Sequence, residues 1–218
     1  MYKRQFEKIA YDLRASSTQG EITFPRDLAM MNQRAIAQIA ETHIAFLREN
    51  VSTDARRIVD KLPTNFLRLG LFSLLYPNAR IIHCQREPMA TCWSCFTKNF
   101  NTKTHLSFTF DLADLGFHYR EYQRLMKHWH AVLPGKILDI PYEQLIQEPR
   151  GMSEAMIDHL GLDWEETCLK FNEQKTSVQT ASSWQVRQPI YSDANAKWRQ
   201  YEDHLGPLIE ALESNGGS

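Results

Sequence analysis

Apolar residues recur at helical spacing over residues 26–50, in the stretch RDLAMMNQRAIAQIAETHIAFLREN. The members of this apolar stripe are Leu28, Ile36, Ile39, Ile44 and Leu47. Residues three or four positions apart share one face of an α-helix, and Pro25 just ahead is a typical start signal. The pattern therefore predicts a helix of about six turns.

Three short apolar runs rich in β-branched residues predict strands. They are RIVD at residues 57–60, ARIIHC at 79–84 and KILDI at 136–140. Helical patterns at residues 65–76 and 115–133 separate them. Such alternation is typical of a mainly parallel sheet with right-handed crossovers.

Ligands of a parallel sheet bind beyond the carboxyl ends of its strands. In this chain that rule directs the search to residues 60–61, 85–94 and 141–142. These segments contain the polar candidates considered below.

Composition indicates one soluble domain. The chain has 218 residues, of which 43% are hydrophobic and 23% charged. We expect a single domain over residues 1–213 and a disordered tail at 214–218. The net charge of −1 gives no general attraction to nucleic acid or anionic lipid, so anion binding must be local.

The sequence favours a cytoplasmic location. No run has the roughly 18–20 apolar residues that a membrane span needs, and the first residues lack the apolar centre of a signal peptide. The four cysteines do not have the spacing of a secreted disulfide scaffold.

The segment after the second predicted strand carries a candidate anion site. Pro88 is placed to begin a helix that runs through Ser94 to about Lys98. Arg86 offers a bidentate fork, Ser94 a hydroxyl, and Lys98 a charge one turn further on the same helix face. The alternative is that Arg86 pairs with Glu87 or Asp111 and that Ser94 is a buried helix hydroxyl.

Cys92 and Cys95 lie inside this predicted helix and face the same side of it. A thioredoxin-like pair would sit at a helix start, and no second Cys or His pair completes a zinc site. Packing is the favoured interpretation, so their replacement is expected to leave anion binding nearly unchanged.

Five motifs follow one another along the chain. They are VDKLPTNF (59–66), LYPNARIIHCQREPMATCWSCF (75–96), YEQL (142–145), LGLDW (160–164) and VRQPIYSDANAKW (186–198). In this order and spacing the chain resembles the sulfotransferases that use 3′-phosphoadenylyl sulfate (PAPS). It is most similar to the bacterial branch that resembles tyrosylprotein sulfotransferases and is often joined to helical TPR repeats. The resemblance covers residues 59–212.

The resemblance implies a fold and a nucleotide site. The fold is α/β, a P-loop-type three-layer fold with a mainly parallel sheet and flanking helices, here without its first strand. Arg86 and Ser94 would hold the 3′-phosphate with help from Lys98, and Tyr142 would contact the nucleotide from the end of the third strand. A loop over residues 182–191 would cover it. The expected contacts from this loop and beyond are Ser182, Ser183, Gln185, Val186, Arg187 and Lys197.

The resemblance also implies two catalytic residues. Sulfuryl transfer needs in-line placement, cations near the leaving phosphate and a base for the acceptor hydroxyl. Lys61 matches a lysine near the bridging oxygen of the phosphosulfate. Glu21 matches the catalytic glutamate of tyrosylprotein sulfotransferases, and its alternative is a solvated loop residue. PAPS is the expected cosubstrate, and no metal is expected.

One family element has no counterpart in the sequence. The family begins with a strand and a Pro-Arg/Lys-Ser-Gly-Thr-Thr loop whose amides hold the 5′-phosphosulfate. Without these donors the chain alone is expected to turn over slowly or not at all. It is interpreted as an N-terminally truncated part of a longer enzyme, and the alternative is a relative that has lost activity.

The expected function is transfer of a sulfuryl group from PAPS to a hydroxyl acceptor, either a protein tyrosine or a small molecule. Fusion to helical repeats in a longer chain is compatible with the resemblance. The alternative is a catalytically inactive nucleotide-binding or interaction module on the same fold. A P-loop kinase is disfavoured because the sequence has no Gly-x-x-x-x-Gly-Lys-Ser/Thr.

Overall fold

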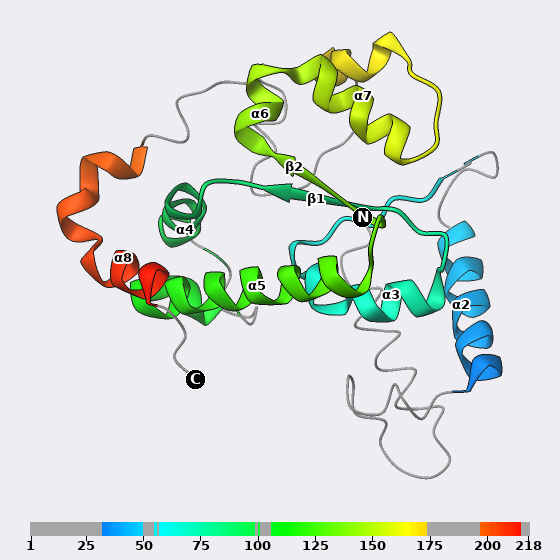
Figure 1. Cartoon of the computed structure of the whole chain (residues 1–218), viewed down its shortest axis with the longest axis horizontal. Helices are drawn as coiled ribbons and strands as arrows, with labels where there is room; N and C mark the ends of the chain where they lie inside the picture. The colour runs from blue at the N-terminus through cyan, green and yellow to red at the C-terminus, as the bar shows by residue number, and fades with distance from the viewer. Residues whose placement is uncertain are drawn as a thin grey trace. The chain divides into compact units, whose positions relative to one another are not determined.

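The chain forms two compact units that divide after Ala79. The computed structural model describes residues 32–49, 55, 57–98, 100, 106–173 and 197–214 (Figure 1). Each unit is described by itself, and a single domain over residues 1–213 stays a prediction. Among the described residues, no helix is long and apolar enough to cross a membrane.

The first unit contains helix α2 (Gln33–Arg48), which confirms most of the helix predicted at residues 26–50. Asn32 caps it, because its side-chain oxygen accepts a hydrogen bond from the Ala35 amide at 2.9 Å. Leu28 and the rest of residues 26–31 lie outside the described residues.

A short 3₁₀ helix, η2 (Pro63–Arg68), continues into α3 (Leu69–Leu75) and confirms the helical pattern predicted at residues 65–76. Leu71 and Leu75 are buried, and Ile36 and Ile39 of α2 pack against them. Part of the predicted apolar stripe, Ile36 and Ile39, therefore belongs to the core of this unit.

The strand predicted at residues 57–60 is wrong. This segment belongs to no helix or strand, and the side chain of Val59 is 82% exposed. An apolar run is stable as a strand only with a paired neighbour and a covered face. No described residue pairs with it, so Lys61 follows an irregular segment and not a strand.

His43 is a buried polar residue of the first unit, and its Nδ1 atom hydrogen-bonds the hydroxyl group of Tyr76. Burial lowers the pKa of His43, because it disfavours the charged imidazolium. Burial also raises the pKa of Tyr76 to about 12.

We expect the first unit to lose stability as the pH falls from about 7 to about 5. The folded pKa of His43 lies below the unfolded value of about 6.5, so below that pH the unfolded state binds more protons. Urea unfolding at both pH values measures the effect. His43→Gln should show a smaller pH dependence than the parent, and an equal dependence would contradict the assignment.

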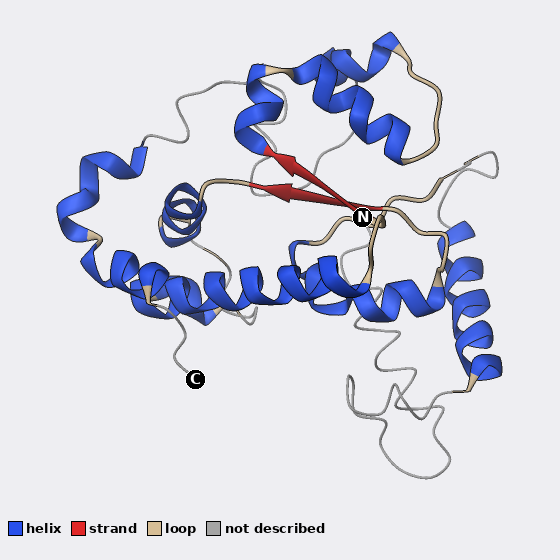
Figure 2. Ribbon diagram, viewed as in Figure 1, coloured by secondary structure: helices blue, strands red, loops and turns tan. Residues whose placement is uncertain are grey.

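The second unit contains a two-stranded parallel sheet, formed by β1 (Ile81–Gln85) and β2 (Ile137–Pro141) (Figure 2). This confirms the mixed α/β class and the strands predicted at residues 79–84 and 136–140 to within two residues. The fold is mostly helical around this small sheet.

Parallel strands need a long crossover connection. Here it contains α4 (Pro88–Phe96), the 3₁₀ helix η3 (Ser107–Phe110) and α5 (Leu112–Val132). Helix α5 confirms the pattern predicted at residues 115–133. The turn into β2 contains Gly135, whose φ of +72° is a left-handed conformation that glycine adopts without strain.

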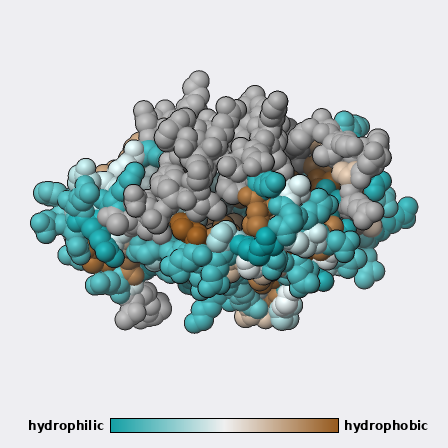
Figure 3. All heavy atoms as spheres, turned by 90° about the horizontal axis from the view of Figure 1, so that it is seen from above, coloured by the Kyte–Doolittle hydropathy of each residue, from teal (hydrophilic) through white to brown (hydrophobic). Residues whose placement is uncertain are grey.

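After β2 the chain is helical. It forms α6 (Tyr142–Gln147), α7 (Pro149–His159), η4 (Glu166–Glu173), η7 (Lys197–His204) and α8 (Gly206–Glu213). Figure 1 draws α5 below the strand pair and α6 and α7 above it, so helices flank the small sheet. In the view of Figure 3, the hydrophobic side chains of described residues form small separate areas on a hydrophilic surface.

The last helix packs closely on α5. A Cβ atom added at Gly116 of α5 would lie 2.6 Å from the Cβ of Ala211 in α8. Such a distance is below van der Waals contact, so the two helices would have to move apart. The missing side chain at Gly116 therefore permits this helix contact.

We expect Gly116→Ala to reduce the free energy of unfolding by about 1–3 kcal/mol, which urea denaturation measures. The matched control is Gly151→Ala in α7, where an added Cβ atom meets nothing within 4 Å. The control should gain about 0.5–1 kcal/mol through helix propensity. Equal effects of the two substitutions would contradict the packing argument.

Candidate functional site

The candidate site begins where the two strands end. Arg86 follows β1 and Tyr142 follows β2, and the ladder pairs Gln85 with Pro141 just before them. The central guanidinium carbon of Arg86 lies 5.3 Å from the centroid of the Tyr142 ring. This is a cation–π contact, so the strand ends present a cation and an aromatic face side by side.

Two further contacts hold the backbone at this edge. The amide of Glu87 donates a hydrogen bond to Oε1 of Glu143 at 3.1 Å, which joins the segment after β1 to helix α6. The hydroxyl of Tyr119, on α5, donates to the carbonyl of Arg86 at 3.2 Å. Sequence reasoning missed both residues, although Glu143 lies in the YEQL motif and Tyr119 lies in the helix predicted at residues 115–133.

The amino end of α4 is capped by its own sequence. The Glu87 carboxylate accepts hydrogen bonds from the amides of Met89 at 3.0 Å and Ala90 at 2.6 Å. An anion near this helix start would therefore rely on side-chain cations more than on the backbone amides.

Asp111 has a similar role at the start of α5. Its Oδ1 atom accepts hydrogen bonds from the amides of Ala113 at 2.8 Å and Asp114 at 2.9 Å. The two carboxylates that the alternative interpretation pairs with Arg86, those of Glu87 and Asp111, thus both act as helix caps.

Ser94 lies half-buried on α4, which begins at Pro88 as predicted. The helix ends at Phe96, two residues earlier than the sequence suggested. Lys98 therefore lies just beyond the helix and not on its face, and its amide donates a hydrogen bond to the carbonyl of Cys95 at 3.2 Å. Helix ends commonly close with such a tighter turn.

Nearby charges affect the pKa of the Cys95 thiol. Burial raises its pKa, while the positive charges of Lys98 and Arg86 act in the opposite direction. Both cations are therefore close enough to the carboxyl-terminal half of α4 to influence the same sulfur atom.

The packing interpretation of Cys92 and Cys95 is confirmed. Both are free thiols. Cys92 is buried in a cluster with Leu115 and Leu208, and Cys95 packs against that cluster. Burial, with smaller contributions from Cys95 and Glu87, raises the pKa of Cys92 to about 12, so its thiol is inert at neutral pH.

Lys197 is the first residue of η7 and is exposed. This short helix lies against α4, because the ring of Tyr201 stacks on Trp93 with 4.6 Å between centroids. The stacking fixes the segment that carries Lys197 beside the helix that carries Ser94.

Lys61 belongs to the first unit and its side chain is exposed. Its neighbour Asp60 is half-buried, and burial raises the pKa of its carboxyl group despite a hydrogen bond from Asn65 that lowers it. The remaining predicted site residues, Glu21, Ser182, Ser183, Gln185, Val186 and Arg187, lie outside the described residues.

The described part of the site has side chains that suit a nucleotide. A guanidinium fork and an ammonium suit a phosphate group, and an aromatic ring next to them suits a flat base or sugar face. The guanidinium of Arg86 and the ring of Tyr142 come from the carboxyl ends of parallel strands, where α/β folds bind ligands.

Comparison with known proteins identifies the family of the chain. A family model described as "Sulfotransferase family" matches residues 2–166, which is more than half of the chain. The chain belongs to the sulfotransferase family. The match reaches further toward the amino terminus than the motif resemblance, which began at residue 59.

This sulfotransferase chain is also 34% identical over 191 residues to an uncharacterized protein of Aquifex aeolicus (strain VF5). The alignment covers 87% of the chain and 25% of that relative. The chain thus spans about a quarter of the length of the curated relative that it matches.

Proposed function

We propose that the chain binds PAPS at the carboxyl ends of β1 and β2 and transfers its sulfuryl group to a hydroxyl acceptor. The contact of Arg86 with Tyr142 carries the proposal, because it joins an anion-binding fork to an aromatic face at the switch from strand to helix. Membership of the sulfotransferase family supports sulfuryl transfer as the chemistry.

In this proposal the 3′-phosphate is held by side chains around α4. Arg86 donates two parallel hydrogen bonds to the phosphate, Ser94 donates its hydroxyl, and Lys98 supplies a second positive charge. Tyr142 contacts the nucleoside. Lys197 and the segment with Ser182, Ser183, Gln185, Val186 and Arg187 cover the nucleotide.

The transfer step exchanges one oxygen on sulfur for another. The acceptor hydroxyl oxygen forms a bond to sulfur while the bond from sulfur to the 5′-phosphate oxygen breaks, and the hydroxyl proton passes to a base. Glu21 is the proposed base, and Lys61 stabilises the negative charge that develops on the leaving phosphate. Adenosine 3′,5′-bisphosphate is the second product.

The proposed acceptor is a protein tyrosine. The support is the resemblance of the motifs to the TPR-linked bacterial branch that is similar to tyrosylprotein sulfotransferases. A tyrosine hydroxyl has a pKa near 10, so a general base is needed to remove its proton at neutral pH.

The test is incubation of the chain with PAPS and either a tyrosine-containing peptide or a small phenol, followed by mass spectrometry. A sulfated peptide, lost in Lys61→Ala, would support the proposal. A sulfated phenol alone would replace the tyrosine acceptor by a small molecule. Because the chain alone is expected to turn over slowly, the incubation is long and uses a high chain concentration. Nucleotide binding without any product from either acceptor under these conditions would favour the inactive nucleotide-binding module instead.

A further inference from the structure

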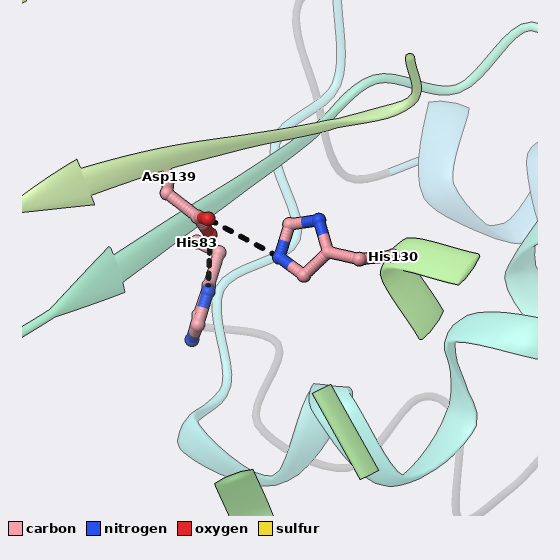
Figure 4. A group of neighbouring side chains, drawn as sticks. All are labelled: His83, His130 and Asp139. Atoms are coloured by element: carbon pink, nitrogen blue, oxygen red, sulfur yellow. Dashed lines mark hydrogen bonds and ion pairs between the residues drawn. The ribbon is translucent and has the colours of Figure 1, made fainter. Parts of the chain in front are cut away.

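Three metal-ligand side chains from three separate elements meet in the second unit, and none of them is a proposed nucleotide contact. His83 lies at the centre of β1, Asp139 is its partner across the ladder in β2, and His130 lies in the last turn of α5. Their nitrogen and oxygen ligand atoms all lie within 4.8 Å of one another. Figure 4 shows both imidazoles directed at the Asp139 carboxylate.

The carboxylate joins the two imidazoles, with one oxygen to each. Oδ1 of Asp139 lies 2.7 Å from Nδ1 of His83, and Oδ2 lies 3.2 Å from Nε2 of His130. Ligand atoms on a tetrahedral zinc ion, with bonds of about 2.1 Å, lie roughly 3.4 Å apart. The 3.2 Å separation is close to this value, and the 2.7 Å separation is about 0.7 Å shorter, so His83 and the carboxylate would move slightly apart around an ion.

The hydrogen bonds of His83 hold its ring on both sides. Its Nδ1 atom donates to Oδ1 of Asp139 at 2.7 Å, because a carboxylate oxygen can only accept. Its Nε2 atom hydrogen-bonds the hydroxyl of Tyr122. A divalent ion would replace the proton on Nδ1, and the ring would then carry its proton on Nε2, facing Tyr122.

We propose that His83, His130 and Asp139 form a binding site for a divalent transition metal, with zinc as the ion of choice. Two imidazoles and one carboxylate are a ligand set that such ions take with positions left open. Tyr122 acts as the outer partner that fixes the His83 ring, as in known metal sites.

The site is accessible to an ion from solvent. The side chain of His83 is 12% exposed, that of Asp139 38%, and that of His130 39%. A bound ion would link β1, β2 and α5 to one another. Each strand ends two residues after its ligand, directly before Arg86 and Tyr142. The inference does not depend on the proposed function, because sulfuryl transfer itself needs no metal.

The experiment is calorimetric titration of the EDTA-treated chain, made without a histidine tag, with ZnCl₂. All proteins carry Cys84→Ser, because that exposed thiol could bind zinc by itself. We expect saturable binding of one equivalent and a zinc-dependent rise of the melting temperature. His130→Ala should weaken binding at least about tenfold, and Tyr122→Phe, which leaves the three ligands in place, by about tenfold.

The matched control is His128→Ala. His128 is an exposed histidine on the same helix and lies outside the group of three. It should bind zinc as the parent does. Absence of zinc uptake by a parent chain that is folded by circular dichroism would overturn the proposal. Equal affinity of the parent and His130→Ala would also overturn it, since the zinc would then be held elsewhere.

Discussion

Replacing Arg86 by alanine is expected to weaken the binding of adenosine 3′,5′-bisphosphate by about 10- to 150-fold. Hydrogen bonds to a charged group contribute about 1.5–3 kcal/mol, and each 1.4 kcal/mol corresponds to a factor of ten. Arg86 is the residue with the clearest position in the site, because the strand ladder and the ring of Tyr142 both fix it. Calorimetric titration of both proteins measures the change.

Two variants separate the guanidinium fork from charge alone. Arg86→Lys keeps the charge but loses the planar fork, so its affinity should lie between those of the parent and the alanine variant. Arg124→Ala removes an exposed arginine of α5 that pairs with Glu121 of the same helix at 2.6 Å, and it should bind as the parent does. Unchanged affinity in Arg86→Ala would place the phosphate elsewhere.

Leu208→Ala is expected to lower the free energy of unfolding of the second unit by about 2–5 kcal/mol. Leu208 is fully buried and packs with Cys92 of α4 and Leu115 of α5. Its truncation removes apolar contacts and leaves a cavity between three helices that cannot close completely. Urea unfolding followed by circular dichroism measures the loss.

The control for this substitution is Val132→Ala at the end of α5. The side chain of Val132 is 50% exposed, so its truncation should cost less than about 1 kcal/mol. If both substitutions lowered the free energy of unfolding by the same amount, α8 would not be part of the core that supports α4. The same packing buries the Cys92 thiol in this cluster.

Local patterns in the sequence predicted the elements that depend on local physics. Helix α5 has a capping aspartate and a long apolar stripe, and its observed start lies three residues before the predicted one. Pro88 marked a helix start correctly, because its backbone preference does not depend on distant contacts.

The strand predicted at residues 57–60 is absent because a strand depends on distant contacts. Its β-branched composition is typical of a strand, but strand formation depends on a partner elsewhere in the chain, which no single run of residues specifies. Lys98 was assigned to the face of α4 because spacing alone does not show where a helix ends.

The missed contacts of the site are long-range. Glu143 reaches the Glu87 amide, and Tyr119 reaches the Arg86 carbonyl, across separations of 56 and 33 residues. His83 and Asp139 are likewise brought together only by the register of β1 and β2. These pairings follow from the parallel ladder. The sequence predicts that the strands are parallel, but it does not predict which residues of the two strands face one another.

The central claim is that a nucleotide phosphate binds where β1 and β2 end. A crystal structure of the chain with adenosine 3′,5′-bisphosphate tests it most directly. The account predicts the 3′-phosphate within hydrogen-bond distance of the Arg86 guanidinium and the Ser94 hydroxyl, with the nucleoside against Tyr142. A nucleotide bound away from Arg86, or crystals grown at saturating nucleotide that contain none, would contradict it.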